Sequence, residues 1–156
     1  FIDEDLTMRD YLKEIISSFK ETSEKNFILN IDQDSNSKKL TKSIEIVYGL
    51  RNFIGNANKF SKSKVFIEII TNNDYSEIII EDDGEGYPSD VLSKIGEPYI
   101  KSLKSNVKSK SGLGLGIFIG KTLLEKNFAS ISCKNSKKKT GAKVTIKWKN
   151  KDLLSL

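Results

Sequence analysis

The sequence predicts an α+β fold, a two-layer α/β sandwich in which about five strands form a mixed, mostly antiparallel sheet and three main helices cover one face. Two observations predict this fold. Long stretches repeat apolar residues at helical spacing, and short runs rich in β-branched residues lie between them, joined in pairs by polar turns. The β-branched runs pair as hairpins, and the helices must bury their apolar stripes against the resulting sheet.

Each element of the N-terminal half has its own signal. Thr7 followed by Asp10 resembles a capping box, and the apolar residues after it recur every three or four positions, as in a helix. The apolar residues of the stretch 41–60 have the same helical spacing. An alternating run marks a short strand, and β-branched runs around an Asn-Asn-Asp turn mark a hairpin. The expected elements are a helix at 7–24, a strand at 27–31, a helix at 41–60 and strands at 65–71 and 75–81.

The C-terminal half begins with Pro88, which suits the first turn of a short helix. A serine- and lysine-rich segment with few large apolar side chains then predicts a solvated, mobile loop. A strongly apolar helix and two closing strands follow. The expected elements are a helix at 88–94, a loop at 96–111, a helix at 113–127 and strands at 129–135 and 142–148, so that one domain covers 1–150 and a flexible tail covers 151–156.

Composition excludes several functions. No run of about 18 apolar residues exists to span a membrane. The net charge is +5, but the lysines are scattered among acidic residues and Arg9 and Arg51 are the only arginines, which argues against nucleic-acid binding. Cys133 is the only cysteine, so no disulfide forms within the chain, and the absence of histidine removes histidine-based acid–base, metal and nucleophile chemistry. Because the chain starts without methionine, we expect a fragment of a longer protein.

Asn52, Asn56 and Lys59 are spaced to share one face of the second predicted helix. Magnesium prefers octahedral oxygen ligands and retains water, so one amide oxygen beside phosphate oxygens is sufficient. We expect Asn56 to supply that oxygen and Lys59, one turn later, to bring a positive charge to the phosphates. Taken alone, the three residues fit a solvent-exposed helix face better than a binding site.

The sequence Asp-Asp-Gly-Glu-Gly at 82–86 follows an apolar strand. A buried carboxylate at Asp82 requires a hydrogen-bond donor, and the exocyclic amino group of adenine is one, whereas guanine has a carbonyl there. Gly84 and Gly86 are expected to adopt positive φ and to let the backbone lie close to the base. The alternative is an ordinary Asp-Gly turn.

The sequence Gly-Leu-Gly-Leu-Gly at 112–116 lies where the predicted loop enters the third long helix. Glycines cost helix stability and therefore need a reason. Gly112 and Gly114 would free backbone amides for phosphates at a helix start, while Leu113 and Leu115 would anchor the loop. A plain hinge is the alternative. Together with the two preceding motifs, this run predicts a pocket for adenine, magnesium and a triphosphate.

Four motifs in this order resemble the ATP-binding catalytic domain of sensor histidine kinases, within the gyrase/Hsp90/histidine kinase/MutL superfamily; they read GLRNFIGNANKFS, EDDGEGYP, IGEPY and GLGLGIFIGKTLLE. Their wording is most similar to the redox-responsive RegB/PrrB group. The resemblance implies a Bergerat-type fold, ATP and Mg²⁺, and transfer of the γ-phosphoryl group to a histidine on a separate dimerisation domain and then to a response regulator. It also implies a membrane-anchored homodimeric parent whose catalytic part is cytoplasmic, with no nucleic-acid partner.

The resemblance also implies residue roles. Asn56 would hold magnesium, Asn52 and Lys59 would face the phosphates, Asp82 would bind adenine, and residues 96–111 would form the ATP lid. The remaining implied nucleotide-binding residues are Phe60 and Tyr87 on the base or ribose side, Ile95, Tyr99, Gly84, Gly86, and the run Gly112, Leu113, Gly114, Leu115 and Gly116.

The chain departs from the family pattern at three places. Gly-Glu-Pro-Tyr at 96–99 replaces Phe-x-Pro-Phe, Gly141-Ala142 replaces the frequent Gly-Thr, and Gly55 replaces an acidic or polar residue. The ATPases of the superfamily place a water-activating glutamate four residues before the magnesium asparagine; here that residue is Asn52, which cannot take a proton. Phosphoryl transfer to a protein side chain is therefore favoured. An ATPase or chaperone-like relative and a non-catalytic nucleotide-binding module remain as alternatives.

Overall fold

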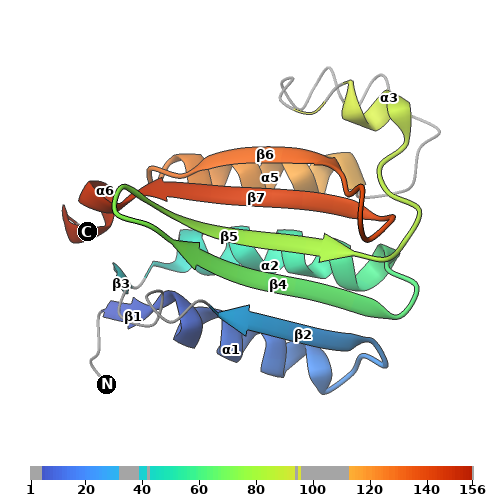
Figure 1. Cartoon of the computed structure of the whole chain (residues 1–156), viewed down its shortest axis with the longest axis horizontal. Helices are drawn as coiled ribbons and strands as arrows, with labels where there is room; N and C mark the ends of the chain where they lie inside the picture. The colour runs from blue at the N-terminus through green and yellow to red at the C-terminus, as the bar shows by residue number, and fades with distance from the viewer. Residues whose placement is uncertain (1–4, 32–38, 42, 94, 96–112, 156) are drawn as a thin grey trace.

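In the computed structural model, one five-stranded sheet carries the long helices on a single face (Figure 1). The structure describes residues 5–31, 39–41, 43–93, 95 and 113–155. The strand order is β2-β4-β5-β7-β6; β2 pairs parallel with β4, and the other neighbouring pairs are antiparallel. The strands are β2 Asn26–Ile31, β4 Lys64–Thr71, β5 Tyr75–Asp82, β6 Ser130–Asn135 and β7 Ala142–Lys149. The predicted fold class is confirmed.

Three helices form the second layer behind this sheet: α1 Met8–Lys20, α2 Ile44–Phe60 and α5 Leu113–Glu125 (Figure 1). The predicted cap of the first helix is present, since the N–H of Asp10 donates to Oγ1 of Thr7 at 3.0 Å. The helices and the inner face of the sheet enclose one core, in which Phe53 and Trp148 are among the largest fully buried side chains. The short helix α3, Ser89–Leu92, follows β5 in the chain.

The sequence patterns missed a small second sheet and misplaced the start of α2. Strands β1 (Asp5–Thr7) and β3 (Lys39–Thr41) pair antiparallel, and each is too short to show an alternating pattern. We expected α2 to begin at Thr41, but it begins at Ile44 because Ser43 is the N-cap. The Ser43 hydroxyl accepts from the N–H groups of Glu45 and Ile46.

The C-terminal residues also differ from the expected loose tail, because α6 spans Asn150–Ser155 and Leu153 is buried. Asn150 fastens the start of α6 to the β4–β5 turn. Its side-chain oxygen accepts from the Ser76 hydroxyl at 2.6 Å, and its Nδ2 donates to the Asn72 carbonyl at 2.7 Å. These partners lie more than 70 residues away in sequence, and no local pattern reveals such contacts. The domain boundary at residue 150 stays a prediction.

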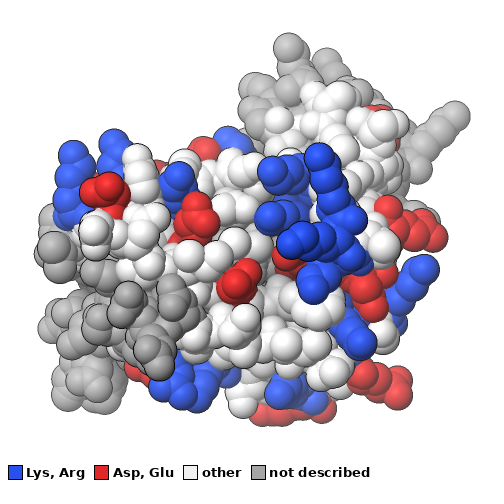
Figure 2. Space-filling model, viewed as in Figure 1, with Lys and Arg blue, Asp and Glu red and all other residues white. Residues whose placement is uncertain are grey.

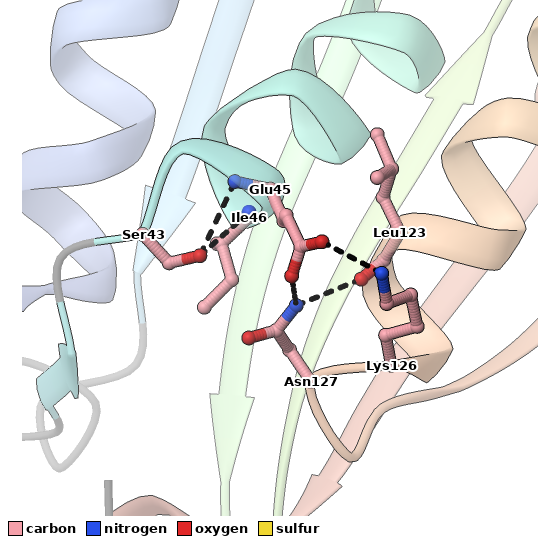
Figure 3. A network of polar contacts seen from close by, with 6 residues as sticks. All are labelled: Ser43, Glu45, Ile46, Leu123, Lys126 and Asn127. Atoms are coloured by element: carbon pink, nitrogen blue, oxygen red, sulfur yellow. Dashed lines mark hydrogen bonds and ion pairs between the residues drawn. The ribbon is translucent and has the colours of Figure 1, made fainter.

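A polar network joins the start of α2 to the end of α5 (Figure 3). The Glu45 carboxylate accepts from Nδ2 of Asn127 at 3.1 Å and pairs with Nζ of Lys126 at 3.0 Å. Asn127 Nδ2 also donates to the Leu123 carbonyl at 2.9 Å. The bonds from Lys126 and Asn127 lower the pKa of Glu45. The two helices thus lie antiparallel, with the start of α5 beside the later turns of α2.

The opposite face of the sheet carries charges of both signs (Figure 2). Lys147 and Glu77, for example, pair across β7 and β5 with 3.8 Å between Nζ and Oε2. Basic residues gather toward the β6–β7 turn, where Lys134 and Lys143 are register partners (Figure 2). Among the described helices, none combines the length and apolar character that crossing a bilayer requires.

Candidate nucleotide-binding site

A cavity of about 320 Å³ opens between α2, the end of β5 and the start of β7. This volume lies within the range of small-molecule sites, which combine apolar walls with a few polar groups. Its lining residues are Phe53, Asn56, Ala57, Lys59, Phe60, Lys62, Ile80, Asp82, Gly84, Glu85, Gly86, Tyr87, Pro88, Ala142 and Val144.

Asp82 is a buried acidic residue that lines this cavity. It is the last residue of β5 and only 3% exposed, and its Oδ1 accepts from the N–H of Gly84 at 2.8 Å and of Ala142 at 3.4 Å. Burial raises the pKa of Asp82, although these two N–H groups oppose the shift. A desolvated carboxylate that lines a cavity is typical of a binding site.

The loop after Asp82 folds back over the cavity. Gly86 has φ of +82° and therefore needs a residue without a side chain, as predicted. The predicted positive φ at Gly84 is wrong. Gly84 is required for a different reason, because a Cβ there would overlap the carbonyl oxygen of Phe60 at the end of α2. The loop thus packs directly against α2.

Asp83 fastens the same loop to the turn between α2 and β4. Its carboxylate accepts from the backbone N–H groups of Lys62, Ser63 and Lys64 at 2.8–3.1 Å and from the Ser63 hydroxyl at 3.0 Å. Burial by itself raises the pKa of Asp83, but the four hydrogen bonds outweigh it and lower the pKa from 3.8 to about 2.

We expect Asp83→Asn to lower the free energy of unfolding by about 1 kcal/mol at pH 7. This value is the stabilisation that hydrogen bonds to a carboxylate provide, reduced because solvent screens the exposed charge. Because the folded-state pKa is depressed, the wild-type contribution is complete above pH 3.8 and is lost as the pH falls toward about 2. Urea denaturation of both proteins from pH 7 to pH 3 measures the difference. A difference that stays constant across this range would contradict the prediction.

The predicted face of α2 points partly into the cavity. Asn56 and Lys59 are lining residues, whereas Asn52 is not, and Nδ2 of Asn52 donates to the Tyr48 carbonyl at 2.8 Å. Gly116 of α5 lies against this face, since a Cβ there would be 3.4 Å from both amide atoms of Asn56 and 3.7 Å from Oδ1 of Asn52. The glycine run and the asparagine face therefore meet in space.

The surroundings of Asn56 fit a magnesium ion held together with phosphates. Nδ2 of Asn56 is a buried polar atom without a hydrogen-bond partner in the described part of the chain. Such a donor is costly unless an acceptor such as a phosphate oxygen meets it, and Oδ1 of the same amide is the atom that could face a cation. The described residues contain no cluster of three or more His, Cys, Asp or Glu side chains that could hold a metal alone. Magnesium that keeps phosphate and water ligands needs only one protein oxygen, which an amide provides.

Lys25 orders the end of α2 beside the cavity, a contact that the sequence patterns missed. Its Nζ donates to the carbonyl oxygens of Asn58 and Ser61, each at 2.7 Å, and to the Ser61 hydroxyl at 3.1 Å. These carbonyls belong to the last helical turn, where a positive charge is favourable. Lys25 thus fixes the turn that carries Lys59 and Phe60.

The remaining predicted site residues are placed as follows. Phe60 and Tyr87 line the cavity, and Tyr87 is buried. Ile95 packs against the core and is not a lining residue. Leu113, Gly114 and Leu115 form the first turn of α5 with Gly116. Tyr99, Gly112 and the predicted lid at 96–111 lie outside the described residues.

Several lining residues were not predicted. Phe53 and Ala57 flank Asn56 on α2, and their helical spacing could have indicated them. Ile80 and Val144 face the cavity as register partners of β5 and β7. That pairing joins strands far apart in the chain, and no local pattern determines it.

Comparison with known proteins identifies the family and the fold of this chain. A family described as histidine kinase-, DNA gyrase B- and HSP90-like ATPase matches residues 41–152. Sensor histidine kinase RegB of Cereibacter sphaeroides is 40% identical over 97 residues, which cover 59% of this chain and 21% of that protein. Sensor protein SrrB of Staphylococcus aureus is 33% identical over 88 residues, 55% of this chain and 15% of that protein. The matched region is thus about a fifth of RegB and less of SrrB.

Among solved structures, a nucleotide-free catalytic domain of histidine kinase ThkA superposes with a TM-score of 0.75. The sequences are 17% identical, and the match covers 94% of this chain and 96% of that one, which shows a shared fold. The predicted likeness to sensor histidine kinase catalytic domains, and to RegB among them, is confirmed. The chain belongs to the family of histidine kinase-, DNA gyrase B- and HSP90-like ATPases.

Proposed function

We propose that this chain is the ATP-binding catalytic part of a sensor histidine kinase, and that it donates the γ-phosphoryl group of ATP to a histidine on a separate dimerisation domain. The observation that carries the proposal is the convergence of Asn56 and Asp82 on one cavity, with Gly116 of α5 against Asn56. An ATP site requires these three stretches to meet, and they do so although they lie far apart in the sequence.

In the proposed complex, Asp82 accepts a hydrogen bond from the adenine amino group. Phe60 and Tyr87 line the base or ribose, beside the close backbone of Gly84 and Gly86. Asn52 and Lys59 face the phosphates from α2. The start of α5 and its glycine run, with Ile95 and Tyr99, complete the nucleotide-binding set.

Asn56 would hold magnesium in this site. The bound ion supplies positive charge that offsets and orients the phosphates. Phosphoryl transfer asks little more of a protein than positioning and charge neutralisation, and Lys59 contributes to both. The α2 face offers no proton acceptor for an attacking water, because Asn52 is an amide whose Nδ2 already donates to Tyr48. Transfer therefore fits this site better than hydrolysis does.

The phosphoryl acceptor must come from outside this chain, since the 156 residues contain no histidine. We propose that the acceptor domain belongs to the parent kinase, a membrane-anchored homodimer with this part in the cytoplasm. The phosphoryl group would pass from that histidine to an aspartate of a response regulator. The similarity to RegB and SrrB supports this arrangement.

We expect the chain alone to bind Mg-ATP and to remain unlabelled by ATP that carries ³²P at the γ position. Adding a folded dimerisation domain from a sensor histidine kinase, in trans or fused, should produce acid-labile label on that domain. A dimerisation domain with its histidine replaced by glutamine is the control and should stay unlabelled. Rapid ATP turnover by the chain alone would instead indicate an ATPase, and a lack of ATP binding would indicate a non-catalytic interaction module with a vestigial pocket. ATP binding without transfer would count against the kinase assignment.

A further inference from the structure

Asn135 lies at the end of the edge strand β6 and contacts the loop that follows Asp82, but it does not line the cavity. The N–H of Tyr87 donates to Oδ1 of Asn135 at 2.7 Å, and Nδ2 of Asn135 donates to the carbonyl oxygen of Tyr87 at 3.2 Å. One bond needs an acceptor and the other a donor, so a side-chain amide can make both at once. Asn135 therefore holds the main chain of Tyr87 at two points.

The same amide lies against the tightest point of the loop. Gly86, next to Tyr87, has φ of +82°, and a Cβ added there would be 2.6 Å from Oδ1 of Asn135. Gly86 is thus required both by its own conformation and by the position of Asn135.

Strand β6 holds the side chain of Tyr87 as well. Cys133 is two residues before Asn135, on the same side of the strand, and its thiol interacts with the Tyr87 side chain. Burial raises the pKa of Cys133 to about 11 and raises the pKa of Tyr87, so both groups stay neutral at physiological pH. Tyr87 is 7% exposed and forms part of the cavity wall. Strand β6 therefore holds both the main chain and the side chain of Tyr87.

We propose that Asn135 is a positioning residue for nucleotide binding, which acts by holding Tyr87 in place as a preformed wall of the cavity. The inference rests on the proposed nucleotide-binding function. A wall that is already ordered costs no entropy when the ligand binds, whereas a loop freed from Asn135 must be ordered at that moment. Because Tyr87 faces the base or ribose in the proposed complex, the benefit is independent of the number of phosphates.

Two variants separate the two hydrogen bonds. Asn135→Ala removes both, and Asn135→Asp keeps an acceptor for the N–H of Tyr87 while losing the donor. Calorimetry with Mg-ADP and with a Mg-bound non-hydrolysable ATP analogue should show affinity lower by about tenfold for Asn135→Ala, equally for both ligands, and a smaller loss for Asn135→Asp. Amide hydrogen exchange at Tyr87 in the nucleotide-free protein should accelerate in Asn135→Ala and stay near the wild-type rate in Asn135→Asp.

Asn30→Ala is the matched control, because Asn30 is exposed on the opposite edge strand β2. It should leave both measurements unchanged. Affinity of Asn135→Ala within twofold of the wild type, or unchanged exchange at Tyr87, overturns the inference alone. Failure of both Asn135 variants to fold would make the residue structural and would also overturn it. Absence of nucleotide binding by the wild type overturns the proposed function and this inference together.

Discussion

Replacing Asp82 with asparagine is expected to weaken the binding of a Mg-ATP analogue by about 1–3 kcal/mol, the cost of losing a hydrogen bond to a charged group. Asp82 is almost fully buried and lines the cavity. The two backbone N–H groups that donate hydrogen bonds to its carboxylate both donate to Oδ1. Its Oδ2 therefore serves as the acceptor for the adenine amino group in the proposed complex. Calorimetry on folded protein measures the change.

Asp83→Asn provides the matched control for this variant. It makes the same chemical change one residue later, at a carboxylate that is not among the lining residues of the cavity. Because an asparagine keeps the Oδ1 acceptor for the N–H groups of Lys62, Ser63 and Lys64, the loop should stay anchored. We therefore expect this variant to retain wild-type affinity at a temperature where both variants are folded. Equal affinities of wild type and Asp82→Asn would refute the proposed adenine contact.

The same contact has a pH dependence with a definite sign. Because burial raises the pKa of Asp82, this carboxylate takes up a proton at a higher pH than an exposed aspartate does. Its charge-assisted bond to the ligand should therefore weaken as the pH is lowered through that raised pKa. Asp82→Asn carries no charge to lose and should show a flatter profile.

Replacing Gly141 with alanine is expected to reduce the free energy of unfolding by about 2–3 kcal/mol and to impair nucleotide binding. An added Cβ would overlap both Oδ1 and the main-chain oxygen of Asp82. The N–H of Gly141 donates to that main-chain oxygen at 3.0 Å, so the backbone of β5 would have to move. Such a shift displaces the carboxylate that the ligand needs. Urea denaturation and calorimetry measure the two effects.

Gly55→Ala is the control for this substitution, because the nearest atom to a Cβ at Gly55 is Cζ of Phe19 at 3.4 Å. Gly55 lies inside α2, where alanine is favoured over glycine by about 0.5–1 kcal/mol. This variant should therefore be neutral or more stable. If Gly141→Ala were as stable as the wild type, the close packing of the β6–β7 turn on Asp82 would be wrong.

Residue type and order along the chain were sufficient to predict several residues that line the cavity. Asn56 and Lys59 follow the helical period, and Asp82 ends an apolar strand, so each was identified together with its element. The role of Asn52 stays a prediction: Asn52 shares the helix face of Asn56, but it donates to the Tyr48 carbonyl and is not among the residues that line the cavity. Sharing a helix face does not determine which residues of that face a neighbouring element leaves accessible.

The sequence by itself determined the fold class, the principal elements and the three stretches that we propose bind the nucleotide. These features depend on local periodicity and on residue type, which a single segment contains in full. Only the tertiary structure revealed that Asn135 holds Tyr87, that Gly141 packs on Asp82, and that Asn150 fastens α6 to the β4–β5 turn. Each of these contacts joins segments that are distant in the chain. Their geometry follows from the register of paired strands and the packing of the whole core, which no local stretch specifies.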